Sequence, residues 1–330
     1  MKNKNNILVL AEMNGDTPSD LTQEMLGCGR QLVKESQSSV TAVVFGNNLE
    51  NVGQDLISFG ADQVFLVNDM LCDPYQADAW LPDMTALAKE TKANLILMGH
   101  NSVGGDLAPR LAFYLKCGIA TSCEAIEIKE EKTLLTRTCY GGKAREVLSF
   151  GREIAVATVR PKSQKPIAQD RERSGKIKII PLSAKKSDIR IKVIEHNRED
   201  NSGLKLEDAP IIVSGGGGLG GPEGFKIASS LAAVLGGAVG ASRVACDRGW
   251  CPAGYQIGLS GKTVAPELYF AVGISGASHH MAGCANAKNI VAINNDPNAP
   301  MFNFARFGAV ADFEELVPAL TEHIAKLKTK

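Results

Sequence analysis

The stretch of sequence that decides the fold is Ile211-Ile-Val-Ser-Gly-Gly-Gly-Gly-Leu-Gly-Gly-Pro-Glu-Gly224. Its short apolar run predicts a buried strand, and Pro222 is typical of the first turn of a helix. Between the two, Gly215, Gly217 and Gly220 satisfy the spacing G-x-G-x-x-G. Glycines in such a strand–turn–helix context let backbone N–H groups approach a phosphate closely. The motif therefore predicts a nucleotide phosphate site, with a merely flexible loop as the alternative.

The residues around this motif repeat the strand–helix alternation. Apolar runs predict strands at 211–213, 238–241, 268–272 and 290–293, and helical spacing predicts helices at 222–235 and 313–327. Together they predict a compact, doubly wound α/β domain that covers residues 209–330.

The N-terminal half shows the same alternation but ends differently. Strands are expected at 7–11, 40–45, 64–67 and 94–98, and helices at 21–34, 54–59, 77–91 and 105–115. Such repeated units predict a Rossmann-like parallel sheet covered by helices. Four short runs then follow at close intervals, at 124–128, 134–138, 144–150 and 154–159. They predict antiparallel strands on one edge of that sheet.

Two polar segments follow the predicted N-terminal sheet. Residues 161–189 hold three prolines and eight basic against three acidic residues, which indicates either a solvated excursion or a basic docking arm. Residues 197–208 read NREDNSGLKLED and predict a hinge or linker. The expected organisation is an α/β domain over 1–196, the hinge over 197–208 and the second domain over 209–330.

Composition excludes several classes of protein. The 330 residues carry 36 Lys and Arg against 36 Asp and Glu, and this zero net charge argues against a general nucleic-acid or anionic-membrane binder. No apolar run approaches the roughly 20 residues that cross a bilayer, so no stable membrane insertion is expected. The eight cysteines lack the spacing of zinc or iron–sulfur sites, and no metal is expected. These features predict a cytoplasmic protein with reduced thiols.

Further candidate ligand residues follow the next predicted strand. The usual dinucleotide fold requires an acidic residue about 20 positions after the glycine motif, but this chain has Ala241-Ser-Arg243 instead. Arg243 could hold the 2′-phosphate of NADP, which keeps an NADP-dependent dehydrogenase as the alternative function. The cluster Gly258-Leu-Ser-Gly-Lys-Thr263 is either a simple turn or a phosphate contact. It is not an NTPase loop, because Gln256 occupies the position of the required first glycine.

Two more clusters lie at predicted strand ends. Gly273-Ile-Ser-Gly-Ala-Ser-His-His280 follows the strand at 268–272, and Ala292-Ile-Asn-Asn-Asp-Pro297 ends the strand at 290–293. Ligands of open α/β sheets bind at the carboxyl ends of the strands. The four strand ends therefore predict one extended nucleotide site, without a competing catalytic triad or carboxylate pair.

Taken together, these motifs resemble a known family. SGGGGLGGPEGF, GASR, SGKTVAPELY, VGISGASHH, IVAINNDPNAPMF and FGAVADFEELVP are similar, in order and spacing, to the C-terminal domain of the electron-transfer flavoprotein α subunit, its large subunit. ILVLAE, GGDLAPRLA, TRTCYGG and VATVRP resemble its N-terminal domain. The resemblance covers nearly the whole chain and implies that FAD, not NADP, is the cofactor.

The resemblance also implies a role for individual residues. Arg243 would lie over the flavin ring and favour its anionic forms, Ser260 would lie near flavin N5, and His280 near flavin O2. Leu259 and Gly217 depart from the family, which commonly has glutamine and arginine at these positions. The full set of FAD contacts implied by the resemblance is Gly217, Ser242, Arg243, Leu259, Ser260, Gly261, Lys262, Thr263, Ser275, Gly276, Ala277, His280, Asn294 and Asp312.

Partners are implied in the same way. The family forms a heterodimer in which the N-terminal domain packs on a smaller β subunit. The resemblance implies an electron carrier subunit, not a stand-alone enzyme, that moves electrons between an acyl-CoA dehydrogenase-type flavoenzyme and an acceptor. Relatives in anaerobes work in NADH-dependent, electron-bifurcating complexes, and the sequence leaves open whether this chain does so.

Overall fold

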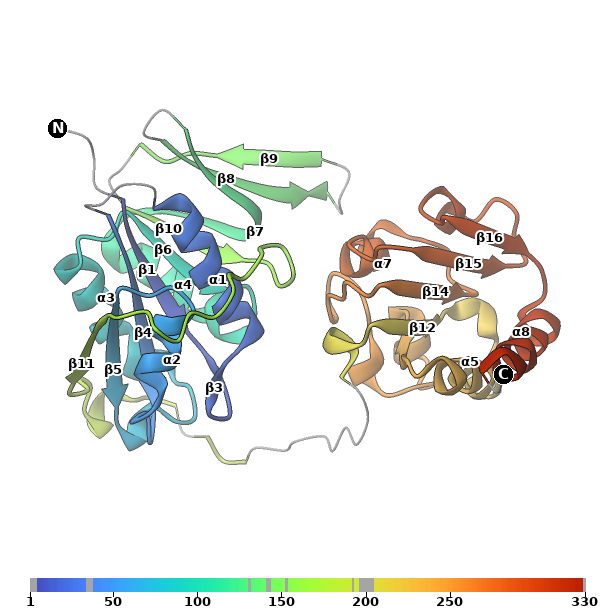
Figure 1. Cartoon of the computed structure of the whole chain (residues 1–330), viewed down its shortest axis with the longest axis horizontal. Coiled ribbons are helices and arrows are strands. Elements are labelled where there is room, and N and C mark those ends of the chain that lie inside the picture. Colours follow the sequence, from blue (N-terminus) through green and yellow to red (C-terminus); the bar gives the residue numbers. More distant parts are fainter. Residues whose placement is uncertain are drawn as a thin grey trace. The chain divides into compact units, whose positions relative to one another are not determined.

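The computed structural model describes residues 5–33, 38–129, 132–140, 144–151, 154–191, 193–195 and 205–328. The chain divides into two compact units, one formed mainly by residues up to 197 and the other by residues from 198 onwards (Figure 1). Residues 197–204 of the expected hinge lie outside the described residues, and Leu206–Asp208 form a short 3-10 turn, η4. The hinge therefore stays a prediction.

The described part of the N-terminal unit is built on a nine-stranded sheet. Its strand order is β11-β5-β4-β1-β6-β10-β7-β8-β9. The strands are β1 (Asn6–Ala11), β4 (Ser39–Gly46), β5 (Gln63–Asn68), β6 (Leu95–Gly99), β7 (Gly118–Lys129), β8 (Lys132–Cys139), β9 (Ala144–Leu148), β10 (Ala155–Val159) and β11 (Lys176–Ile180). The small strands β2 (Met13–Asn14) and β3 (Thr17–Pro18) form a separate hairpin.

Helices cover this sheet and enclose two apolar cores. They are α1 (Asp20–Leu32), α2 (Val52–Ser58), α3 (Ala77–Glu90) and α4 (Ser102–Leu115), with 3-10 turns η1 (Met70–Cys72) and η3 (Lys186–Asp188). Alternate residues of β1 point to opposite faces, so Val9 joins one core and Leu8 and Leu10 join the other. The predicted parallel sheet between helices is confirmed.

The prediction for β10 is wrong in its pairing. The run 154–159 was expected to be an antiparallel edge strand, but β10 lies between β6 and β7 and is parallel to both. All five of its residues, Ala155–Val159, are buried, which is typical of an interior parallel strand with both faces covered. The antiparallel part is the β7–β8 pair, in which Ile126 lies opposite Leu135.

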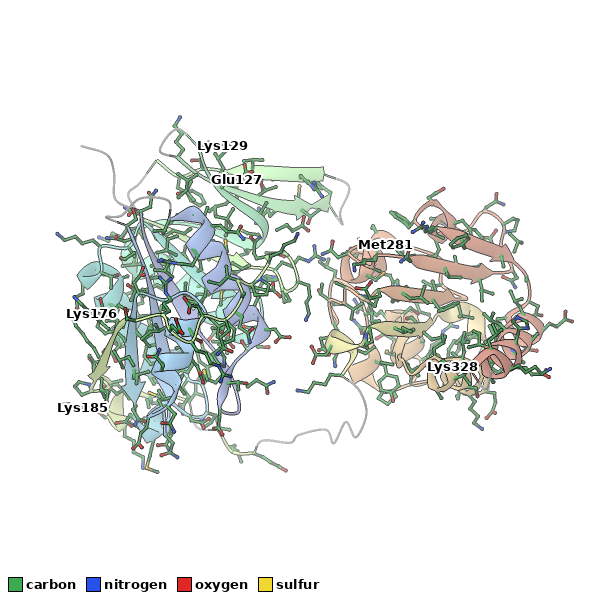
Figure 2. All side chains as sticks on the ribbon, viewed as in Figure 1. Glu127, Lys129, Lys176, Lys185, Met281 and Lys328 are labelled. Carbon is green, nitrogen blue, oxygen red and sulfur yellow. The ribbon has the colours of Figure 1, made fainter. Side chains whose placement is uncertain are left out.

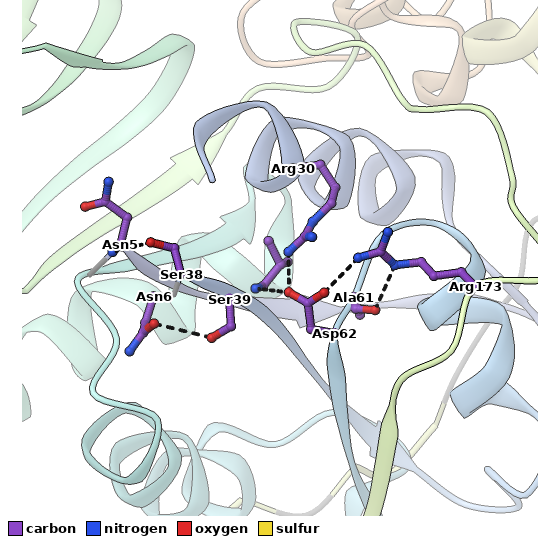
Figure 3. Close-up of polar contacts among 9 residues, drawn as sticks. Asn5, Asn6, Arg30, Ser38, Ser39, Ala61, Asp62 and Arg173 are labelled. Atoms are coloured by element: carbon purple, nitrogen blue, oxygen red, sulfur yellow. Dashed lines mark hydrogen bonds and ion pairs between the residues drawn. The ribbon is translucent and has the colours of Figure 1, made fainter. Parts of the chain in front are cut away.

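The basic segment 161–189 is attached to the sheet. It contributes β11, which pairs in parallel with β5 at the edge. Figure 3 shows the ion cluster that holds the approach to this strand: the Asp62 carboxylate accepts hydrogen bonds from Arg30, from the backbone N–H of Val40 at 2.9 Å and from Arg173 at 2.7 Å. The prediction that residues 161–189 form a solvated excursion is therefore wrong where this segment forms β11.

The C-terminal unit contains a parallel five-stranded sheet in the order β13-β12-β14-β15-β16. The strands are β12 (Ile211–Gly215), β13 (Ala238–Ala241), β14 (Leu268–Val272), β15 (Ile290–Asn294) and β16 (Phe307–Val310). β16 was not predicted, because it is short and mostly exposed. The chain reverses its direction of strand addition between β12 and β14, and doubly wound sheets bind ligands at this point.

Helices lie on both faces of the second sheet. They are α5 (Pro222–Leu235), α6 (Arg243–Asp247), α7 (Ser278–Cys284) and α8 (Phe313–Lys328), with the turns η5 (Gly217–Leu219), η6 (Ala253–Tyr255) and η7 (Pro300–Asn303). α5 and α8 pack side by side, and Lys328 donates to the Val234 carbonyl at 2.7 Å. Met281 of α7 packs into the core of the opposite face (Figure 2). The doubly wound prediction is confirmed.

Candidate functional site

A cavity of about 480 Å³ lies in the C-terminal unit, where β12 and β14 end. It forms at the reversal point of the sheet, as expected for a ligand site in this topology. Its lining combines backbone and apolar side chains with a few polar groups. The lining residues are Gly217, Gly218, Ser242, Arg243, Val244, Gln256, Ile257, Gly258, Leu259, Ser260, Gly273, Ile274, Ser275, Ala277, His279 and His280.

The glycine loop after β12 packs directly against the loop after β14. The Gly218 N–H donates to the Gly273 carbonyl at 2.9 Å, and the Gly216 N–H donates to the Val272 carbonyl at 2.9 Å. A Cβ at Gly216 would lie 2.2 Å from the Gly273 oxygen, and a Cβ at Gly218 would lie 2.8 Å from the Gly273 Cα. Both positions therefore need glycine so that the two backbones can approach each other.

Gly217 differs from its neighbours. A Cβ there would meet only the Val244 side chain, at an ordinary 3.5 Å, and the residue is exposed at the cavity. Position 217, where the family commonly has arginine, therefore has room for a side chain in this protein.

Two buried polar atoms in the cavity wall lack hydrogen-bond partners. They are Ser242 Oγ and His280 Nδ1. Ser242 sits between β13 and α6, where its backbone N–H donates to the Gly215 carbonyl at 2.9 Å. Because a buried polar atom without a partner costs about 1–3 kcal/mol, two of them in one wall indicate a ligand that supplies the missing partners.

His280 is held as a neutral imidazole. It is 7% exposed, and burial lowers its pKa to about 4, opposed only by the nearby backbone of Ile257. Its Nε2 lies 2.8 Å from the hydroxyl of Tyr269, a wholly buried residue of β14. At neutral pH His280 therefore offers hydrogen bonding to a ligand without carrying a charge.

Arg243 supplies the positive charge at this site. It is the one Lys or Arg among the described residues that line the cavity. Its Nε donates to the Asp247 carboxylate at 3.1 Å, one turn along α6, and its side chain is 69% exposed. The guanidinium is therefore well hydrated and shares its charge with a neighbour, which weakens its field at the cavity.

The loop 258–263 is only partly at the cavity. Leu259 and Ser260 line it, and the Gln256 side chain donates to Ser260 Oγ at 2.9 Å. Gly261, Lys262 and Thr263 are not among the lining residues. The Lys262 ammonium instead pairs with Glu207 at 3.1 Å, so the structure gives it a role in holding the loop to η4.

A second, more polar cavity of about 230 Å³ adjoins the first and shares Gly218 and Gly273 with it. Asn294 and Asp312 line it. The Asn294 amide donates to the Ile274 carbonyl at 3.0 Å, which ties the ends of β14 and β15 together. Gly276 lines neither cavity, because its backbone, at φ +86°, packs against Met301.

The structure thus brings ten of the fourteen expected contact residues to two adjoining cavities. Those at the first are Gly217, Ser242, Arg243, Leu259, Ser260, Ser275, Ala277 and His280, and those at the second are Asn294 and Asp312. Gln256 and His279 also line the first cavity and were not predicted as contacts, although His279 directly precedes His280 in the motif VGISGASHH. Tyr269 was missed because a tyrosine within an apolar strand is typical of a core residue.

The two cavities differ from the site expected of a dinucleotide fingerprint. That motif places the pyrophosphate at the N-terminus of the first helix, here α5. Neither cavity is lined by residues of α5: the first lies towards β14, α6 and α7, and the second lies towards β15 and the start of α8. The glycine motif therefore serves the packing of two loops and the wall of a cavity beyond them.

Comparisons with known proteins agree with this geometry. The model of the electron transfer flavoprotein domain matches residues 7–185, and that of the electron transfer flavoprotein FAD-binding domain matches residues 205–285. Electron transfer flavoprotein subunit alpha of Thermoanaerobacterium thermosaccharolyticum is 42% identical over 99% of this chain and 100% of the relative. The subunit of the same name from Bacillus subtilis is 38% identical over 97% and 98%. Protein FixB of Clostridium saccharobutylicum is 34% identical over 95% and 94%.

The FAD-binding match decides between the two cofactors that the sequence left open. It covers β12, the glycine loop, Arg243 and His280, which are the parts of the chain that build the first cavity. The expectation of FAD is confirmed. This chain belongs to the electron transfer flavoprotein α subunit family, and its C-terminal unit is the FAD-binding domain.

Proposed function

We propose that this chain is the FAD-carrying subunit of a heterodimer with a smaller β subunit, and that it carries electrons between an acyl-CoA dehydrogenase-type flavoenzyme and an acceptor. The observation that carries the proposal is the first cavity, with its two partnerless buried atoms, Ser242 Oγ and His280 Nδ1. The names of the relatives support the electron-transfer part.

The chain's own residues suit a flat, partly polar ring system. Val244, Ile257, Leu259 and Ile274 supply apolar surface, and Ser242, Ser260 and His280 supply hydrogen-bonding groups. Bound FAD would supply the one- and two-electron redox chemistry that amino-acid side chains lack. The protein binds and orients the cofactor, and Arg243 favours negative charge on the ring. The second cavity, beyond Gly218 and Gly273, would take a further part of the same cofactor.

The site is open enough for electron exchange. Leu259 is 61% exposed and Val244 49% exposed, and both belong to the cavity wall. Exposed apolar residues at the edge of a cofactor site suit contact with another protein. We propose that this rim meets the donor and acceptor proteins in turn.

We also propose a cytoplasmic location. The eight cysteines are free thiols, which suits a reducing compartment. Among the described residues, no helix is long and apolar enough to span a membrane, and no group of three or more His, Cys, Asp or Glu side chains could hold a metal ion.

The test is purification of the chain together with its β subunit, followed by release and identification of the cofactor. We expect a yellow heterodimer whose α subunit releases FAD and which accepts electrons from an acyl-CoA dehydrogenase. A colourless protein that binds NADPH would contradict the proposal. Reduction by NADH in the presence of a second acceptor would add the bifurcating role, and its absence would exclude that role.

A further inference from the structure

Two thiols lie side by side in the C-terminal unit. The Cys246 and Cys251 sulfurs are 3.5 Å apart, and both residues are half-buried, so an oxidant dissolved in water can reach them. Four of the other six cysteines are buried. A disulfide bond is about 2.05 Å long, so the two sulfurs need to approach by only about 1.5 Å to form one. The pair is therefore arranged for oxidation to a disulfide.

The backbone after α6 holds the two thiols together. Gly249 has φ +71°, a conformation that glycine adopts without strain, and its N–H donates to the Cys246 carbonyl at 2.9 Å. The Trp250 N–H donates to the Ala245 carbonyl at 3.1 Å. These two hydrogen bonds close a tight turn at the end of the helix and return Cys251 to the side of Cys246. The proximity of the sulfurs is therefore built into the turn.

This turn belongs to the segment 242–257, which walls the first cavity. Residues 242–244 line the cavity at the start of the segment, and residues 256–257 line it at the end. The two ends are joined, because the Ile257 N–H donates to the Ala241 carbonyl at 2.9 Å. The two thiols lie between these ends, and neither is among the described residues that line the cavity. A bond between the sulfurs would therefore restrain the wall without occupying the site.

The oxidant that suits this pair is a small-molecule disulfide, such as glutathione disulfide. The Cys246 thiolate attacks one sulfur of the oxidant, forms a mixed disulfide and expels the other half as a thiol. Cys251 then attacks the Cys246 sulfur and expels the second half. One S–S bond breaks and one forms, and two electrons and two protons pass from the protein to the two released thiols. Burial raises the pKa of both cysteines, that of Cys251 to about 12, so Cys246 is the first nucleophile.

We propose that Cys246 and Cys251 form a reversible disulfide that stiffens the wall of the first cavity and tightens its hold on FAD. The inference rests on the proposed function, in which FAD is the ligand of this cavity. A bond across the turn removes conformations that the wall segment otherwise loses when the ligand binds, so binding pays a smaller ordering cost. Because coupling between two equilibria is reciprocal, bound FAD favours the disulfide by the same factor.

The first experiment detects the disulfide directly. The heterodimer is incubated with glutathione and glutathione disulfide at fixed ratios, the free thiols are blocked, and the protein is digested with trypsin. Arg248 stands between the two cysteines, so the disulfide appears as peptide 244–248 joined to peptide 249–262. We expect these linked peptides in the oxidised protein and their separation by dithiothreitol. Glutathione carried on either cysteine in place of the link would overturn the inference.

The second experiment measures the FAD dissociation constant of the oxidised and reduced heterodimers. Fixing about one flexible group in advance should lower the constant about 2- to 12-fold in the oxidised parent protein. Cys246→Ser, treated with the same buffers, is the matched control and should show no change. Equal constants in the two forms of the parent, or an equal shift in Cys246→Ser, overturn the inference and leave the proposed function intact. A parent protein that binds no FAD in either form refutes the proposed function and the coupling with it, and the linked peptides then test the disulfide alone.

Discussion

Replacing Arg243 with alanine is expected to lower the reduction potential of the bound flavin. Arg243 is the one Lys or Arg among the described residues of the first cavity's wall. A positive charge beside the ring favours the negative charge that reduction adds, so its removal should make the flavin harder to reduce.

The surroundings of Arg243 set the size of this effect. Two unit charges 4 Å apart interact by about 1 kcal/mol in water and by about 4 kcal/mol at the effective dielectric constant near a protein surface. The guanidinium is 69% exposed and pairs with Asp247 at 3.1 Å, so solvent and counter-charge both reduce its field. A loss of about 1–3 kcal/mol is expected, which corresponds to about 20–60 mV for a two-electron couple.

Potentiometric titration of the heterodimer measures the shift, and α6 offers two informative comparisons. Arg248→Ala removes the same charge just after the helix, where the guanidinium lies 5.0 Å from the Trp250 ring and outside the cavity wall. It should change the potential by less than about 10 mV. Asp247→Asn removes the counter-charge and should raise the potential. An unchanged potential in Arg243→Ala, or an equal shift in Arg248→Ala, would refute the reasoning.

Three further predictions concern the same unit. Gly217→Arg should slow the loss of FAD on a desalting column, because the position has room for a side chain. Gly218→Ala should speed up that loss, because the added Cβ forces the two loops apart. Equal FAD retention in the parent protein and both variants would contradict this prediction. Burial lowers the pKa of His280 to about 4 from 6.5, so the unfolded chain takes up this proton first as the pH falls. The free energy of unfolding, measured in urea, should therefore fall by up to about 3 kcal/mol as the pH is lowered through this range. The fall should be smaller in His280→Gln. The sulfurs of Cys246 and Cys251 lie 3.5 Å apart, so the oxidant diamide should join them in a disulfide with the loss of two titratable thiols. This oxidation should be faster at higher pH, because burial raises the pKa of Cys251 to about 12 and the thiolate is the reacting form. Cys251→Ser should abolish that loss.

Much of the fold could be predicted because its elements carry local patterns. The runs that became β1, β4, β12 and β14 are apolar and bounded by turn residues, and periodicity alone identifies them. Strand pairing is not local, which is why β10 was assigned to an edge. Its sequence does not say that β6 and β7 lie on either side of it. β11 was missed because four of its five residues are exposed and two are lysines.

The candidate site follows the same division. Glycine and hydroxyl residues at strand ends could be predicted, because parallel strands bring their carboxyl ends to one edge. The ion pair that holds Lys262 away from the cavity could not be predicted, because its partner, Glu207, lies 55 residues away in the sequence.

The boundary between the two cavities is made of peptide groups. Gly218 and Gly273 meet there through N–H and C=O atoms, and both residues line both cavities. A wall of this kind has no rotamers and no side-chain charge, so a substitution cannot tune it and can only break it. Any adjustment of the flavin's electronic properties must therefore come from the residues around it, at positions such as 217, 243, 259 and 280. Substitutions at those positions can change the site's properties, whereas the peptide groups between the two cavities must stay as they are.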